Sequence, residues 1–211
     1  MELKSDGADA FNSNRYEYTF TDDVEGWRFF NIPFSDFVRR YDFNPGPSPD
    51  DPINLAAMWG YAILLPGGAS GTFYLDQVTV FGAENGGGPE PPPPPEPVDV
   101  VDDFESGLPS GTDGDGNAIG FFTFDDGNST VSISTTDAPP QPVPEQVDPN
   151  NVLQVDTNVV TNGWAGMVHA FENEVLDTWT PQDWSGYEGF SLWLYGNNTG
   201  RTLFLDILDN R

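Results

Sequence analysis

Residues 189–208 read GFSLWLYGNNTGRTLFLDIL, two runs of β-forming residues separated by a turn rich in glycine and asparagine. The first run alternates between two sets of side chains. These sets are Phe190, Leu192 and Leu194, and Ser191, Trp193 and Tyr195. Because successive side chains of a strand point to opposite faces, the pattern predicts one apolar face and one amphipathic face. The second run is predicted as a further strand.

Short β-rich runs of this kind recur along the whole chain, whereas helical periodicity is nearly absent. Glycine, proline, asparagine and aspartate separate the runs, which is typical of all-β proteins. One helical turn is predicted at 35–40, with Ser35 as its N-cap. The prolines of 44–54 and 136–150 predict loops, since proline cannot donate to a strand ladder. The predicted strands span residues 16–20, 27–32, 57–65, 72–81, 118–125, 129–135, 151–156, 164–171, 189–195 and 202–208.

A linker rich in glycine and proline, residues 84–100, divides the chain into segments 1–83 and 101–211. Its sequence GGGPEPPPPPEP combines a flexible glycine hinge with a polyproline II rod. Linkers normally lie at the ends of a folded module. Here the linker lies in the middle, and sequence with the character of strands continues towards both ends of the chain.

The composition restricts the possible partners. The 211 residues include 34 acidic and 7 basic side chains, a formal net charge of −27. Such a polyanion is repelled by nucleic acid and anionic lipid, whereas it attracts Ca²⁺. There is no cysteine, which excludes disulfides and thiolate chemistry. No apolar run approaches the ~20 residues of a membrane helix, so no membrane insertion is expected. The acidity, the glycines and the prolines together indicate an exported, modular bacterial protein.

Motifs in both segments resemble those of one known family. The motifs before the linker are Gly26-Trp27, Ile32–Phe37, Trp59–Ile63 and Phe73–Val78. In this order they resemble the C-terminal half of galactose-binding-like jelly rolls, above all the family 11 carbohydrate-binding modules and the CIA30-type domains. The motifs after the linker are Val101–Glu105, Gly163–Gly166 and Trp184–Phe190. These resemble the N-terminal half. The resemblance implies an all-β jelly-roll sandwich that the linker splits into a closing half followed by an opening half.

The order of the halves suggests a tandem repeat that is out of phase with the chain. Residues 1–7 resemble residues 205–211, with Glu2 matching Asp206 and Leu3 matching Ile207, so the chain covers about one period of such an array. Three arrangements remain open. The halves close on each other as a circular permutant, they close with neighbouring chains, or the chain is a window of a longer repeat. Contacts between chains would be head to tail and would build a filament.

A structural calcium ion is implied by the resemblance, because such modules commonly tie the first strand to the last through Ca²⁺. The matching carboxylates are Asp103 or Glu105 near the start of the module and Asp76 near its end. Asp76 also stands in an apolar strand, where an unpaired carboxylate is costly. The alternative is an outward-facing residue of a half-exposed strand.

The stretch from Asp113 through Asp115 to Asn117 imitates the start of a calcium loop. Ala118 occupies the place of the turn glycine, and no glutamate stands at the twelfth position. This pattern favours an acidic turn over a calcium site.

Aromatic residues are candidates for a sugar-binding platform. Trp193 and Tyr195 would stack on pyranose rings, and Asp206 would accept hydrogen bonds from sugar hydroxyls. Trp59 and Tyr61 alternate in the same way and form a second candidate pair. The alternative is that these rings fill the sandwich interior or a subunit interface, because tryptophan is usually mostly buried.

Catalysis is not expected from this sequence. Glu172 and Glu174 have the spacing of a carboxylate pair, but such a pair arises readily by chance among many acidic residues. His169 lies in a predicted strand without a nearby nucleophile motif, which favours a packed or hydrogen-bonded role. Asn128 and Asn197 match the glycosylation sequon.

Two functions remain in competition. One is an extracellular structural repeat unit that binds copies of itself head to tail in a filament or surface layer. The other is a non-catalytic module that binds polysaccharide as part of a secreted glycan-degrading protein. A glycosidase, the third possibility, has the least support.

Overall fold

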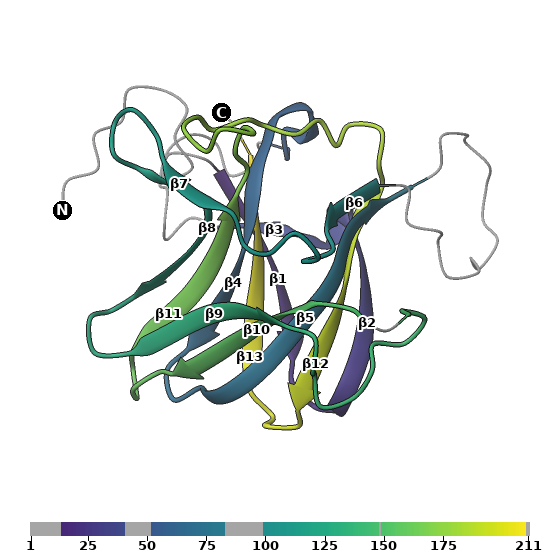
Figure 1. Cartoon of the computed structure of the whole chain (residues 1–211), viewed down its shortest axis with the longest axis vertical. Coiled ribbons are helices and arrows are strands. Elements are labelled where there is room, and N and C mark those ends of the chain that lie inside the picture. The colour runs from purple at the N-terminus through teal and green to yellow at the C-terminus, as the bar shows by residue number, and fades with distance from the viewer. Residues whose placement is uncertain (1–13, 41–51, 83–98, 148, 210–211) are drawn as a thin grey trace.

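The computed structural model describes residues 14–40, 52–82, 99–147 and 149–209. In these ranges two antiparallel sheets pack face to face as a β-sandwich (Figure 1). The seven-stranded sheet has the order β3-β1-β13-β4-β11-β8-β7. The six-stranded sheet has the order β2-β12-β5-β10-β9, and β6 pairs with β5. The all-β sandwich expected from the sequence is therefore confirmed.

Each long strand coincides with one predicted from the sequence, within a few residues at either end. The strands before the linker are β1 (Asn14–Thr21), β2 (Glu25–Pro33), β3 (Val38–Arg39), β4 (Met58–Pro66) and β5 (Ser70–Phe81). The strands after it are β6 (Asp99–Asp102), β7 (Ser110–Thr112), β8 (Ala118–Asp125), β9 (Thr130–Thr136), β10 (Val152–Asn158), β11 (Trp164–Ala170), β12 (Gly189–Asn197) and β13 (Thr202–Asp209).

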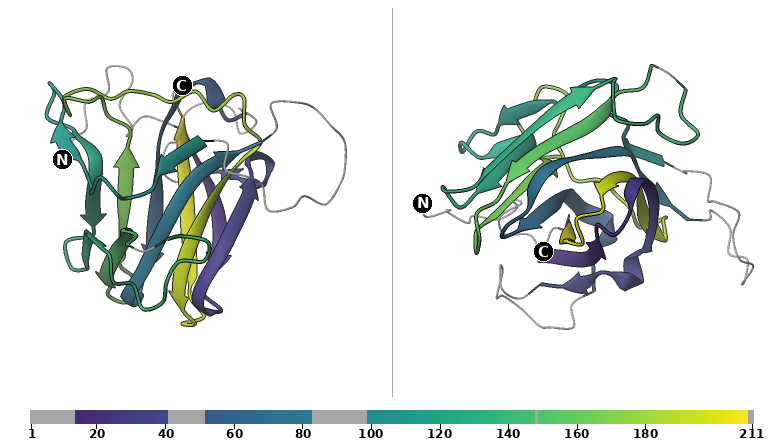
Figure 2. Two further views of the ribbon diagram at one scale, coloured as in Figure 1. Left: turned by 45° about the vertical axis from the view of Figure 1, so that its right-hand side comes forward. Right: turned by 90° about the horizontal axis from the view of Figure 1, so that it is seen from below.

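Strands from the two sides of the linker alternate within both sheets. β13 lies between β1 and β4, and β12 lies between β2 and β5. Figure 2 shows this as yellow strands flanked by purple and blue ones. The two segments thus close on each other within one chain, in the arrangement of a circular permutant. This is one of the three arrangements that the sequence left open, and the same strand pairings also fit an exchange of segments between chains.

The core lies between the sheets and draws on both segments. Ile63 and Leu75 come from the first segment, and Phe190 and Leu205 from the second. All four are fully buried, and burial of each such side chain contributes about 1.5–3 kcal/mol. The alternation predicted for β12 is confirmed, because its apolar set lies in the core cluster and Trp193 and Tyr195 do not.

Three short strands and one helical turn differ from the prediction. The expected turn at 35–40 is a 3-10 helix, Phe34–Asp36, without a side-chain cap from Ser35. The chain then enters β3, which pairs with β1. Strands β3, β6 and β7 have two to four residues, too few for alternation to be visible. β6 begins at Asp99, one residue before the expected end of the linker at residue 100.

Two helical turns flank the strands before the linker. η1 is the 3-10 turn named above, and η2 (Leu55–Ala57) leads directly into β4. Residues 1–13, most of the linker and residues 210–211 lie outside the described ranges, and with them most of the predicted repeat match between 1–7 and 205–211.

A β-bulge in β4 separates Trp59 from Tyr61. The register between β4 and β13 shifts between Leu208 and Asp209, which pair with Gly60 and Met58. Tyr61 therefore enters the core, while Trp59 packs against Trp179 on the outer face. The sequence-based pairing of the two rings on one face was wrong, because alternation breaks at a bulge.

Candidate functional site

A row of side chains on the outer face of the six-stranded sheet crosses five strands, and Tyr195 at its centre is only 4% exposed because its neighbours cover it. Strand pairing places Trp27, Tyr195, Tyr74, Gln154 and Ser134 next to one another on β2, β12, β5, β10 and β9. The rings of Trp27 and Tyr74 meet that of Tyr195 edge to face, at 5.5 and 5.8 Å between centroids. We call these five residues the aromatic row.

A second pair of rings lies beside the aromatic row on the same face. Phe29 on β2 is opposite Trp193 on β12, and their ring centroids are 5.2 Å apart. Both are partly exposed. The rings of Phe29 and Trp193 and the three rings of the aromatic row make one ribbon of aromatic side chains, which we call the aromatic face. The flat faces of such rings are suited to stacking on apolar ligand faces.

Polar side chains border the aromatic row on its other side. Asp156 accepts hydrogen bonds from Thr72 and from Gln154, the latter at 2.7 Å. Asn197 donates its amide to the carbonyl of Thr72, so this sequon side chain is already engaged. Burial and the nearby Asp156 raise the pKa of Tyr74, which keeps its hydroxyl neutral. The border offers acceptors and donors to a ligand rich in hydroxyl groups.

The loop between β9 and β10, residues 137–151, is attached to this face by hydrogen bonds. Trp27 donates its indole Nε1–H to the carbonyl oxygen of Gln141 at 2.8 Å. Asn150 donates to Asp76 Oδ2 at 2.9 Å, and Val143 is buried. The proline-rich loop predicted from the sequence therefore forms a wall beside the aromatic row.

Of the five predicted glycan contacts, Trp193 and Tyr195 lie on this face and the other three do not; Trp193 is partly exposed, whereas Tyr195 is buried between its neighbours. Asp206 is fully buried in the seven-stranded sheet, where Arg40 Nη1 lies 2.9 Å from its Oδ2. Burial raises the pKa of Asp206 to about 6, although Arg40 and Arg15 oppose this. Trp59 and Tyr61 are buried as well. The predicted group was wrong because strand register puts Asp206 on the opposite sheet.

The sequence did not lead us to predict the rings of β2 and β5 as part of this face. A pattern that points to them is present in β2, where Trp27 and Phe29 alternate with the buried Phe30 and Ile32. Tyr74 likewise stands between two buried residues of β5. Alternation contains the information to place these side chains on the outer face, but only the register of the strands brings them into one row.

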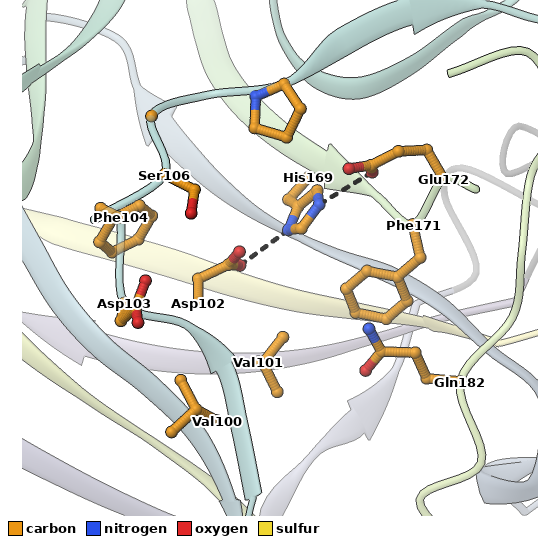
Figure 3. A pocket seen from close by; sticks show the side chains of 12 residues that line it. Val100, Val101, Asp102, Asp103, Phe104, Ser106, His169, Phe171, Glu172 and Gln182 are labelled. Carbon is orange, nitrogen blue, oxygen red and sulfur yellow. Dashed lines mark hydrogen bonds and ion pairs between the residues drawn. The ribbon is translucent and has the colours of Figure 1, made fainter. Parts of the chain in front are cut away.

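A second group of polar residues surrounds His169 (Figure 3). His169 Nδ1 lies 2.7 Å from Asp102 Oδ2, and Nε2 lies 3.1 Å from Glu172 Oε2. Tyr61 donates its hydroxyl to the same Asp102 oxygen at 2.7 Å. We call His169, Asp102, Glu172 and Tyr61 the His169 cluster. It ties β6 to β4 and β11.

Both ring nitrogens of His169 face carboxylates, so both carry protons and the ring is an imidazolium. Burial opposes this charge, but Asp102 and Glu172 outweigh it and raise the pKa of His169 to about 9. The ring also stacks on Phe121 at 4.0 Å. With both nitrogens engaged, His169 cannot accept a proton as a general base would. This agrees with the hydrogen-bonded strand residue expected from the sequence.

The three predicted calcium ligands lie in one region without forming a ligand cage. Asp76 is fully buried, and its Oδ1 accepts a hydrogen bond from the backbone of Gln77. Burial raises the pKa of Asp76 to about 6, and Glu105 and Asp103 add to this. Glu105 also binds Asn151 through both carboxylate oxygens. Among the described residues, no three His, Cys, Asp or Glu side chains converge closely enough to hold a metal by themselves.

The turn at Asp113 is closed by its own hydrogen bonds. Asp113 Oδ1 accepts from the backbone of Asp115 and Asn117. Burial opposes the charge, but the hydrogen bonds from Asn117 and Asp115 and from Trp179 lower the pKa of Asp113. These contacts fit the acidic turn that the sequence favoured.

A comparison with known protein families finds a match for the segment before the linker. Residues 1–83 match the carbohydrate binding domain of family 11. The segment thus resembles that family, as its motifs predicted. No curated protein and no solved structure gives a significant match. The matched segment supplies Trp27, Phe29 and Tyr74 of the aromatic face. In the described ranges, no helix has the length and apolar character needed to cross a membrane.

The charge of His169 predicts a specific loss of stability at high pH. A pKa raised on folding contributes stability that is present below pH 6.5 and is lost as the pH rises through about 9. The loss should be on the order of 3 kcal/mol. Chemical denaturation between pH 6 and 10 measures it. The difference in unfolding free energy between the native protein and His169→Gln should shrink over this range, and a constant difference would contradict the assignment.

Proposed function

We propose that the protein is a non-catalytic module that binds a neutral polysaccharide along the aromatic row. The observation that carries the proposal is the continuous row from Trp27 to Ser134, on a sandwich whose first segment matches a carbohydrate-binding family. In such a complex, the partly exposed rings beside the buried Tyr195 stack on the apolar faces of sugars, while Gln154 and Asp156 bind hydroxyl groups.

The dimensions and charge of the site support a particular kind of glycan. Five strands about 4.8 Å apart give a row of about 19 Å, which suits a chain of sugars rather than a single sugar. A net charge of −27 repels anionic polysaccharides. We therefore infer a neutral, extended glycan. An extracellular location and a link to glycan degradation follow from the family resemblance and belong to the proposal.

A structural calcium ion near Asp76 is part of the proposal. The buried carboxylate of Asp76 is destabilised by its neighbours Asp103 and Glu105, and a cation there would offset this repulsion. Because these side chains do not form a complete cage, carbonyl or amide oxygens would have to supply further ligands. Asn150 and Asn151 already contact Asp76 and Glu105, so their amides are the nearest source.

Head-to-tail assembly into a filament or surface layer is the second candidate function. The alternation of segments in both sheets favours it, because the same pairings would form if two chains exchanged segments. Within one chain, however, the linker holds the segments at an effective concentration in the millimolar range. Exchange of segments between chains therefore competes with closure within one chain only when the protein is very concentrated or refolds from a mixture of unfolded chains.

Trp193→Ala should weaken binding to a soluble β-glucan at least tenfold, about 1.4 kcal/mol, because it removes a partly exposed ring from the face. Affinity gel electrophoresis measures the retardation. Trp164→Ala is the matched control, since Trp164 is 51% exposed and lies in the other sheet. Equal retardation of the native protein and Trp193→Ala would contradict glycan binding on the aromatic face, to which Trp193 and the aromatic row both belong.

Calcium should raise the melting temperature, and a chelator should lower it. At a hundredfold excess over the dissociation constant the stabilisation is about 2.7 kcal/mol, which corresponds to roughly 5–10 °C. Asp76→Asn should melt at the same temperature with and without calcium, and magnesium is the control cation. If the native protein melts identically in calcium and in chelator, it has no structural calcium site.

The mass in solution distinguishes the two candidate functions. We expect the mass of a single chain at micromolar concentration, because the described segments already satisfy each other's strand edges. Light scattering at two concentrations, before and after refolding from denaturant, measures it. Long oligomers in freshly purified dilute protein would instead favour the structural filament.

A further inference from the structure

A cavity of about 410 Å³ lies beside the His169 cluster, away from the aromatic row. One wall is formed by β6 and the residues that follow it, and the other by the end of β11 and the residues beyond it (Figure 3). The volume falls within the range of small-ligand pockets. Val100 and Pro109 contribute apolar surface, while Ser106 and Gln182 contribute polar groups.

The His169 cluster holds two carboxylates in fixed positions at this cavity. Asp102 uses Oδ2 for both Tyr61 and His169, and Glu172 uses Oε2 for His169. Neither Asp102 Oδ1 nor Glu172 Oε1 has a hydrogen bond to any described residue, and neither is a buried atom without a partner. Each carboxylate therefore keeps one solvent-accessible acceptor at the cavity lining.

The charges of the cluster decide which ligands fit. Asp102, Asp103 and Glu172 repel anions from the cavity. The imidazolium of His169 neutralises only part of this charge, so the lining stays net negative and does not exclude cations. Hydrogen-bond acceptors beside apolar surface favour a neutral ligand that donates several hydrogen bonds and has an apolar side, which describes a saccharide, and binding of calcium in its place is an outcome of the test below. Its hydroxyls would donate to Asp102 and Glu172, and the amide of Gln182 would donate to it.

We propose that this cavity is a second saccharide site, which takes one sugar residue through its hydroxyl groups. It is separate from the aromatic row, because Asp102 pairs with Val78 of β5, about 13 Å along the strand from Tyr74. The two sites share no residue. This proposal rests on the proposed function only for the class of ligand, a saccharide.

His169 is the only histidine of the chain, so its imidazole C–H signals in NMR spectra belong to this cavity alone. The probes are glucose, galactose, mannose and a short β-glucan oligosaccharide, each titrated into the full chain to millimolar concentration. At least one should shift the His169 signals saturably. The shift should persist in Trp193→Ala and weaken at least tenfold in Glu172→Gln. Glu174→Gln, an exposed carboxylate two residues further on, is the matched control.

The possible outcomes separate this proposal from the proposed function. If Trp193→Ala keeps its affinity for β-glucan while sugar still shifts His169, glycan binding on the aromatic face fails and the cavity site stands. If no probe shifts His169, or Glu172→Gln leaves the shift unchanged, the cavity site is overturned. A shift produced by calcium and not by sugars also overturns it. Should Glu172→Gln fold poorly, Ser106→Phe, which fills the cavity from an exposed position, must abolish the shift.

Discussion

The structure depends on strand pairing between segments that the linker separates in sequence. β12 and β13 each lie between two strands of the first segment, so neither sheet would be continuous without both segments. The core follows from this pairing, because its side chains come from both sides of the linker. The aromatic row follows as well, since Trp27 and Tyr74 reach Tyr195 only across the β2–β12 and β12–β5 pairs.

The buried charges form a second constraint on this acidic protein. Asp76, Asp206 and Asp209 are buried, and burial raises the pKa of each to about 6. The contribution of these three groups to folding stability therefore decreases as the pH rises from about 4 through 6, because the buried form favours the neutral carboxyl. The stability that His169 contributes is lost at higher pH, near 9, because two carboxylates stabilise its charge and raise its pKa. Asp206 has Arg40 as a compensating cation, whereas Asp76 has neutral donors, which is why a bound cation is proposed there.

The sequence predicted the long strands well, and the candidate sites less well. In β12, alternation alone separated the core set from Trp193 and Tyr195, because a strand has a strict period of two. The same rule failed at Trp59 and Tyr61, where a bulge adds a residue. It could not place Asp206, since alternation shows which residues share a face of one strand and not which sheet contains the strand. The His169 cluster had no local signal, because Asp102 and His169 are 67 residues apart.

By itself, the sequence determined the all-β class, the strand positions and the family resemblance of the segment before the linker. These are local properties, carried by alternation, turn residues and short motifs. The tertiary structure decided how strands of the two segments alternate in both sheets, which rings share a face, and which carboxylates surround His169. These are properties of register and topology, and they depend on which strands become neighbours across long distances in the chain.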